Sequence, residues 1–254
     1  MGTTKIAWII GGGSGIGAAV ASKLAGKGWT VAISGRRVEK LAAVAAGQPG
    51  IHPYPLDVTD AEAIAATIAK IAADFGRIDL ALFGAAAWQP MQVGDYDFEK
   101  FHTIVDTNLL GVVRIANPLI RQFDAQGGGQ FAVIASVAGY FGLPRAGAYA
   151  ATKAALINLL ETMRTELAPK HIIVRMIAPG FVKSELTAKN DFPMPFLMET
   201  DVAAERIVDG LLNSSRFEIA FPRRMVMLMK TIRFLPYPLF FWLTGKMLPK
   251  DKRQ

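Results

Sequence analysis

KIAWIIGGGSGIG, residues 5–17, places a mostly apolar run directly before a cluster of glycines. The run predicts a strand over residues 5–10 that is buried on both faces. A helical pattern follows over residues 16–26, so the glycines lie at a strand-to-helix turn. Glycines there let the backbone approach a pyrophosphate, which the free N–H groups of the helix N-terminus bind. A flexible loop or an ordinary tight turn is the alternative interpretation.

The same alternation of short apolar runs and longer helical patterns continues along the chain. Further strands are predicted over residues 30–34, 52–56, 80–83, 130–136, 172–177 and 217–221, and further helices over 38–46, 61–75, 98–123, 148–167 and 202–212. Apolar strands that alternate with helices predict a parallel sheet covered on both faces. We therefore expect an α/β fold, a doubly wound parallel sheet of Rossmann-like type, in one domain over residues 1–220 with an appendage over 221–254.

Composition excludes several kinds of site. The 254 residues include no cysteine, which excludes disulfides, thiolate metal sites, iron–sulfur clusters and cysteine nucleophiles. The three histidines lack metal-ligand spacing, so we expect no metal site. A hydrolase is not expected either, because the sequence has no G-x-S-x-G elbow.

The positive charge is confined to one end of the chain. Residues 216–254 contain nine Lys/Arg and two acids, which accounts for the whole net charge of +7. The rest of the chain is therefore neutral. We expect no nucleic-acid partner, because such a partner needs a basic surface on the main fold.

The end of the second predicted strand indicates which dinucleotide would bind. It reads Ser34-Gly35-Arg36-Arg37, at the place where folds of this kind carry an acid for the ribose 2′-hydroxyl of NAD. Two guanidinium groups stand there instead, and arginine binds phosphate through paired hydrogen bonds. The sequence therefore predicts NADP(H), with solvated surface arginines as the alternative.

A candidate catalytic pair lies on the helix predicted over residues 148–167. Tyr149 and Lys153 are one helical turn apart on one face. A nearby ammonium and an oxidised nicotinamide ring would lower the phenol pKa, which is ordinarily about 10. Tyr149 could then exchange a proton with a carbonyl or alcohol while hydride moves. By itself, a tyrosine four residues before a lysine also occurs by chance on amphipathic helices, which is the alternative interpretation. Ser136 ends the strand before it and could hold the substrate oxygen beside Tyr149.

Together these motifs resemble the short-chain dehydrogenase/reductase family, in the branch with G-x-x-x-G-x-G and Y-x-x-x-K motifs, over about residues 5–220. The resemblance implies that Ser136, Tyr149 and Lys153 are catalytic and that Asn108 holds a water that relays protons to the lysine. The residues implied to bind cofactor are Gly11, Gly13, Ser14, Gly15, Ile16, Gly17, Arg36, Arg37, Asp57, Val58, Ala85, Tyr149, Lys153, Pro179, Gly180 and Val182. It also implies a homodimer or homotetramer built on the helices over 98–123 and 148–167.

The chain departs from the family pattern at two places. Ile10 stands where relatives usually have Thr, and Gly84-Ala85-Ala86-Ala87 stands where they usually have Asn-Asn-Ala-Gly. The predicted function is hydride transfer between NADP(H) and a carbonyl/alcohol pair, on a lipophilic ketone or secondary alcohol. A non-catalytic nucleotide-sensing or membrane-associated scaffold of the same fold is the alternative, which the missing asparagines keep open.

The appendage over residues 221–254 has two interpretations. Its run FLPYPLFFWLTG, residues 234–245, is uncharged but shorter than the roughly 20 residues that a spanning helix needs. Aromatic residues bordered by Lys and Arg suit a lipid headgroup interface. Alternatively, the segment packs over the substrate pocket or on a neighbouring subunit. We expect Pro236 and Pro238 to hold the chain extended before a helix over residues 239–248. The expected location is cytoplasmic, with the inner face of the membrane as a peripheral contact.

Overall fold

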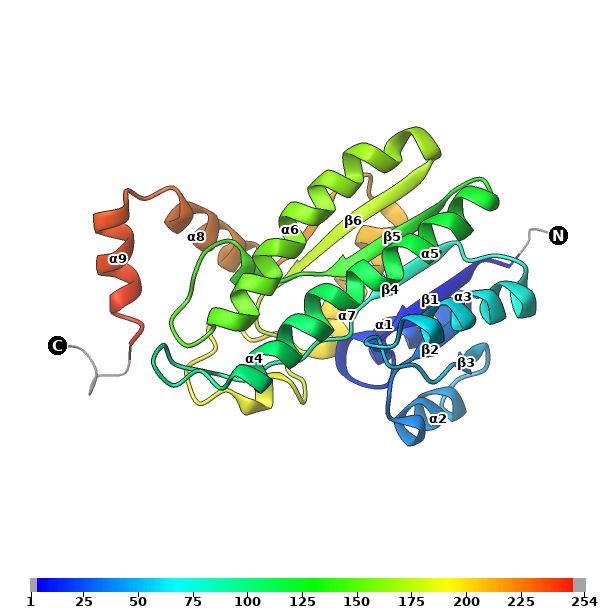
Figure 1. The fold of residues 1–254 in the computed structure, drawn as a ribbon, viewed down its shortest axis with the longest axis horizontal. Coiled ribbons are helices and arrows are strands. Elements are labelled where there is room, and N and C mark those ends of the chain that lie inside the picture. The colour runs from blue at the N-terminus through cyan, green and yellow to red at the C-terminus, as the bar shows by residue number, and fades with distance from the viewer. Residues whose placement is uncertain (1–3, 249–254) are drawn as a thin grey trace.

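The computed structural model, which describes residues 4–248, contains a seven-stranded sheet whose strands all run parallel (Figure 1). The order across the sheet is β3-β2-β1-β4-β5-β6-β7. The strands are β1 (Ile6–Ile10), β2 (Thr30–Ser34), β3 (Ile51–Pro53), β4 (Leu80–Phe83), β5 (Gly129–Ile134), β6 (Ile172–Pro179) and β7 (Glu218–Phe221). This is the doubly wound, Rossmann-like sheet that the sequence predicts.

Helices cover both faces of the sheet, and each face has its own apolar core (Figure 1). One core lies under α1 (Gly15–Ala25), α2 (Val38–Ala46) and α7 (Thr200–Asn213). The other lies under α3 (Ala61–Phe75), α5 (Gly111–Ala125) and α6 (Gly147–Leu167). The central strands are therefore buried on both sides, which explains their nearly continuous apolar character.

The strand order fixes where a ligand can bind. From β1 the chain builds outward through β2 and β3, and it then crosses to the other side of β1 to form β4. The loops that leave the carboxyl ends of β1 and β4 diverge at this point. Open α/β sheets bind ligands in the crevice that this divergence leaves.

The helix predicted over residues 98–123 is interrupted. The structure has α4 (Phe98–Val105), a π-helical turn (Asp106–Leu110) and then α5. The turn contains Asn108, whose side chain is bonded to the backbone of Ala87, a contact between distant parts of the chain. A single helical period in the sequence does not reveal such a turn, and π-helical turns occur frequently at functional sites.

The C-terminal segment also differs from the expectation. A helix that the sequence did not predict, α8 (Arg223–Arg233), precedes α9 (Tyr237–Gly245). Helix α9 begins before Pro238 rather than after it. A proline is tolerated there because the N–H groups of a first helical turn have no intrahelical partner, so the missing one costs no hydrogen bond. The expected extended conformation is confirmed at Pro236 and wrong at Pro238, and the helix predicted over residues 239–248 is present over 239–245. Residues 249–254 of the predicted appendage lie outside the described residues. Within residues 4–248, no helix is both long and apolar enough to cross a membrane.

Candidate active site

The glycine turn after β1 is shaped by two close backbone approaches. Gly11 has φ +88, and a Cβ there would lie 2.6 Å from the backbone nitrogen of Ala85. A Cβ on Gly17 would lie 2.2 Å from the carbonyl oxygen of Gly11. Only glycine fits either position, so the turn passes directly under the loop after β4. The first turn of α1 consequently faces the crevice with its backbone N–H groups.

A cleft of about 530 Å³ opens at this edge of the sheet. Its walls are the loops that follow β1, β2, β3, β4, β5 and β6, together with the start of α6. Every residue that the sequence implicated in cofactor binding lines it, and so do the three implied catalytic residues Ser136, Tyr149 and Lys153. The backbone cradle at one side and the elongated set of lining loops fit a dinucleotide.

Ser136 directly follows β5 and is almost fully buried. Its Oγ accepts a hydrogen bond from Ala138 N at 3.1 Å and donates to Pro179 O at 3.4 Å. These contacts tie together the loops after β5 and β6. A Cβ on Gly139 would lie 2.7 Å from the backbone of Lys153, so the Ser136 loop packs closely on α6.

Tyr149 stands in the first turn of α6, beside Ser136. Burial raises the pKa of Tyr149 to about 12, and a hydrogen bond with Ser136 offsets part of that rise. The phenol therefore keeps its proton at neutral pH. The lowered pKa that the sequence predicts refers to the protein with an oxidised nicotinamide bound, and it stays a prediction; in the chain by itself, burial dominates.

Lys153 is buried one turn further along α6. Its Nζ donates to the carbonyl oxygen of Ile134 at 2.7 Å and lies 5.4 Å from the centroid of the Tyr149 ring. Burial lowers the pKa of Lys153 to about 7. The lysine side chain is therefore held beside the phenol by the last residue of β5. A negative group in the cleft would favour the charged, ammonium form of Lys153.

Asn108 lies behind the cleft wall and not on it. The side chain is completely buried: its Oδ1 accepts from Ala87 N at 2.7 Å, and its Nδ2 donates to Ala87 O at 3.0 Å and to Thr152 Oγ1 at 3.3 Å. These contacts brace the loop after β4, in which the family's usual asparagines are missing. The relay role implied for Asn108 stays a prediction.

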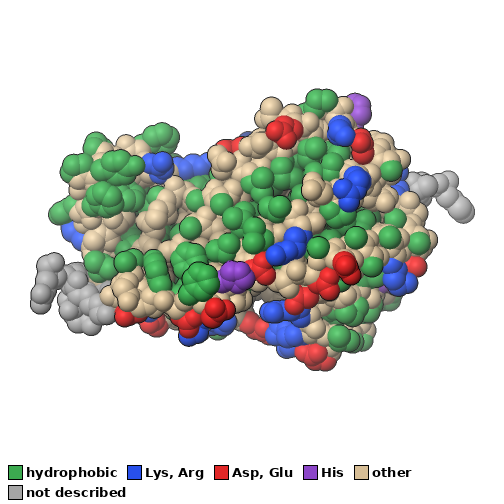
Figure 2. Space-filling view, viewed as in Figure 1, with side chains coloured by type: hydrophobic (Ala, Val, Ile, Leu, Met, Phe, Trp, Pro, Cys, Tyr) green, Lys and Arg blue, Asp and Glu red, His purple; other side chains and the backbone are tan. Residues whose placement is uncertain are grey.

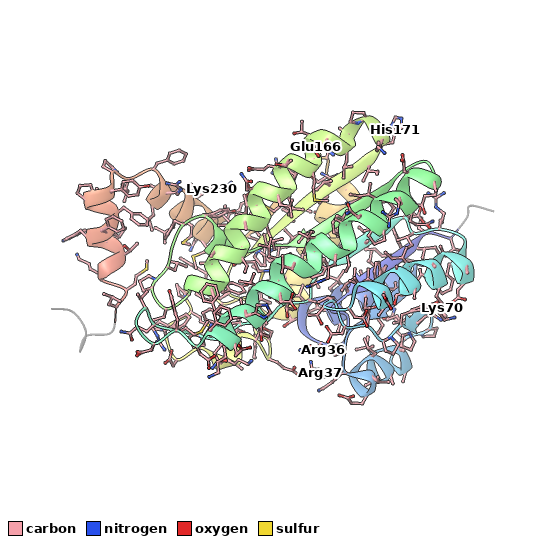
Figure 3. The ribbon with its side chains drawn as sticks, in the orientation of Figure 1. Arg36, Arg37, Lys70, Glu166, His171 and Lys230 are labelled. Carbon is pink, nitrogen blue, oxygen red and sulfur yellow. The ribbon has the colours of Figure 1, made fainter. Side chains whose placement is uncertain are left out.

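The other end of the cleft carries the arginines after β2 (Figure 3). Arg37 Nη1 contacts Glu185 Oε2 at 2.8 Å, and Nη2 donates to Ser14 Oγ at 2.9 Å. Arg36 is exposed and has no ion pair within residues 4–248. Glu185 is not among the predicted site residues, because no local pattern after β6 predicts that this loop returns to the start of α2.

Aromatic and polar contacts close the catalytic end. Trp88 packs edge-on against Tyr149 with ring centroids 5.2 Å apart, and its Nε1 donates to Asn190 Oδ1 at 2.9 Å. Arg145 forms two hydrogen bonds of 2.8 Å with Asp191. The loop after β6 is therefore tied to Trp88, which packs on Tyr149, and to Arg145, which shortly precedes α6. No local sequence pattern predicts these contacts, because they join segments far apart in the chain.

Comparison with known proteins gives the same family that the motifs suggest. The sequence matches the family described as short chain dehydrogenase over residues 5–193. The chain belongs to this family. Members of the short-chain dehydrogenase family use nicotinamide cofactors, and the protein is an oxidoreductase of that family.

Individual relatives extend the likeness beyond the matched region. An oxidoreductase of Myxococcus xanthus is 36% identical over 241 residues, covering 93% of this chain and 94% of that one. A 3-oxoacyl-[acyl-carrier-protein] reductase of Thermotoga maritima is 33% identical over 189 residues, covering 73% and 77%. A short chain dehydrogenase of Burkholderia cenocepacia, solved in complex with NADP, shares the fold with a TM-score of 0.83 at 21% identity and covers 98% and 100%.

Proposed function

We propose that the protein is an NADP(H)-dependent oxidoreductase that interconverts a lipophilic ketone and its secondary alcohol. The observation that carries the proposal is the gathering of Ser136, Tyr149 and Lys153 in the same cleft as Arg36 and Arg37. One end of this cleft has proton-transfer groups, and the other has cations suited to a phosphate.

The residues proposed to hold the cofactor follow the cleft from end to end. The glycine turn and the N-terminus of α1 would take the pyrophosphate. Arg36 and Arg37 would take a 2′-phosphate, and Asp57 with Val58 would border the adenine. The loop over residues 179–182 would border the nicotinamide end, next to Ser136.

The chemistry proposed for this chain is proton transfer beside a hydride-transferring group. A bound nicotinamide supplies or accepts the hydride. Ser136 Oγ would hold the substrate oxygen, and Tyr149 Oη would donate its proton to that oxygen during reduction or accept it during oxidation. A pKa of about 12 keeps Tyr149 protonated near neutrality, which suits donation to a carbonyl.

Lys153 is proposed to stabilise the phenolate that is left after donation. Its Nζ is already fixed by the carbonyl of Ile134, so little reorganisation is needed when negative charge develops on Tyr149. With a pKa of about 7, the lysine is close to half-charged at neutral pH in the chain alone. Phenolate or phosphate charge nearby would shift it toward the ammonium.

The surroundings of Tyr149 support a lipophilic substrate. Trp88 lies against the phenol ring, and Phe181 contacts Phe192 in the loop that closes this end, with ring centroids 6.1 Å apart. One relative is named for a 3-oxoacyl substrate, which is a ketone on an acyl chain. We therefore favour acyl-chain and other bulky apolar ketones over sugars.

A screen of ketones and alcohols, followed by NADPH absorbance, tests the proposal. Turnover should appear with apolar carbonyls and disappear in Tyr149→Phe. Binding of NADPH without turnover across a broad panel would instead favour the non-catalytic scaffold.

We also infer a homodimer or homotetramer built on α5 and α6, in the cytoplasm. Leu110 and Val113 leave apolar side chains exposed where α5 begins, which supports such a contact. Sedimentation of the full chain tests it, and a monomer at all concentrations would contradict it.

A further inference from the structure

Helix α9 is apolar on every side but buries very little. Its residues read YPLFFWLTG, yet only Phe240 and Thr244 are buried. The helix lies at the edge of the molecule, beyond α8 (Figure 1). A helix that is hydrophobic all round normally lies within an apolar environment. The body of the protein does not supply that environment for α9.

The uncovered side chains form one outer surface on α8 and α9. Figure 2 shows hydrophobic side chains gathered over this end of the molecule. We call this surface the C-terminal face; its exposed apolar members are Met227, Leu228, Phe234, Tyr237, Leu239, Phe241, Trp242 and Met247. Phe234 is 86% exposed and Phe241 63%. Clustered exposure of this kind marks an interaction site rather than ordinary surface.

The charges around the C-terminal face have one sign. Residues 222–248 contain five Lys/Arg and no acid. Within the described part of the chain, no carboxylate pairs with Arg223, Arg224 or Arg233, whereas Lys230 pairs with Glu218 of β7 (Figure 3). The face therefore combines aromatic side chains with arginines that no carboxylate within residues 4–248 neutralises.

Helix α8 packs on the body of the protein, and α9 is attached to the same apolar cluster through Phe240. The inner face of α8, formed by Met225, Met229 and Ile232, shares an apolar cluster with Val137 and Phe141. Phe141 and Phe240 meet edge to face with ring centroids 5.3 Å apart. The inner side chains are thus used for packing, and the outer ones stay available at a fixed orientation.

We propose that the C-terminal face docks on an anionic lipid surface. Aromatic side chains at the headgroup level and Lys/Arg on lipid phosphates are the combination that holds proteins at such surfaces. A second copy of the chain fits less well. A two-fold contact through this face would bring its basic residues together with those of the partner, and residues 222–248 contain no acid to offset them.

Flotation of the full-length protein with vesicles tests the proposal. Vesicles of phosphatidylglycerol and phosphatidylcholine should carry the protein at low salt, and pure phosphatidylcholine should carry much less. High salt should weaken the binding, because the Debye length shortens. The fluorescence emission of Trp242 should shift to the blue on binding. Loss of this shift in the variant Trp242→Phe would assign it to Trp242 rather than to the other three tryptophans.

Two pairs of variants separate the apolar and electrostatic contributions. Phe241→Ser with Trp242→Ser should abolish flotation, whereas Phe98→Ser, an equally exposed aromatic on α4, should float like the wild type. Arg223→Glu with Arg224→Glu should weaken binding to anionic vesicles by roughly 30-fold or more, at about 1 kcal/mol per basic residue. The same charge change at the exposed Lys27 and Arg206 should have little effect.

Two results would contradict docking of the C-terminal face on a lipid surface. Failure of the wild type to float with anionic vesicles at low salt would overturn the proposal. So would a concentration-dependent oligomer that the Phe241→Ser, Trp242→Ser variant dissociates, since the face would then join two copies. Neither result depends on enzymatic turnover.

Discussion

Arg37 and Glu185 meet in the wall of the cleft that Tyr149 and Lys153 also line, with Nη1 and Oε2 2.8 Å apart. The pair connects the start of α2 with the loop after β6. Because the same guanidinium also donates to Ser14, Arg37 is already oriented toward the glycine turn. Arg37 lowers the pKa of the Glu185 carboxyl, so Glu185 is ionised near neutrality and would compete with a 2′-phosphate for the guanidinium.

Glu185→Gln should therefore tighten NADPH binding and leave NADH binding unchanged. Both side chains are about half exposed and such ion pairs are weak, so the expected gain is only roughly threefold. Glu39→Gln, which changes an exposed acid on α2 close in sequence to Arg37, is the control. A weaker NADPH affinity in Glu185→Gln would mean that the carboxylate positions Arg37 and does not compete.

Arg36→Asp should erase or reverse the preference for NADPH. The substitution removes a cation with no ion pair among the described residues and introduces a carboxylate that repels a 2′-phosphate. NADPH should bind at least about tenfold more weakly, and NADH should change little. Equal losses for both cofactors, measured by fluorescence titration, would place Arg36 outside the 2′-phosphate site.

Tyr149→Phe should abolish turnover and leave NADPH binding within about twofold, because only one phenolic oxygen is deleted. Steady-state kinetics on a substrate from the carbonyl screen and calorimetry on the same preparation give the two readouts. Retained activity would show that another group donates the proton.

Lys153 should give the folded protein a distinct dependence of stability on pH. Its pKa is about 7 in the folded chain and 10.5 ordinarily, so between these values only the unfolded chain holds the proton. Stability contributed by this group therefore rises with pH from about 7 toward 10, by at most about 1.4 kcal/mol per unit. Urea unfolding at about pH 7 and about pH 9 should show a steeper rise for wild type than for Lys153→Met. Parallel slopes would indicate that Lys153 keeps an ordinary pKa.

Much of the fold follows from local patterns. The helices over Val38–Ala46 and Ala61–Phe75 begin and end where the sequence predicts, and Asp60 caps the second by accepting from Ala63 N at 2.9 Å. Apolar runs predicted every strand of the sheet, although β3 ends earlier and β6 later than expected. Periodicity and capping are properties of neighbouring residues, which is why one sequence suffices for them.

What the sequence missed depends on contacts between distant segments. The π-helical turn at Asn108 follows from its bonds to Ala87, and Glu185 matters only because a loop returns to α2. Helix α8 lies in the predicted appendage, for which the sequence predicts a helix only over residues 239–248. The spacing of Met225, Met229 and Ile232 was the available signal.

The most direct test of the proposed function is calorimetric titration of the wild-type protein with NADPH and with NADH. We predict that NADPH binds at least tenfold more tightly, a difference of about 1.4 kcal/mol or more. Equal affinities, tighter binding of NADH, or no binding of either cofactor would contradict the assignment of NADP(H) to this cleft.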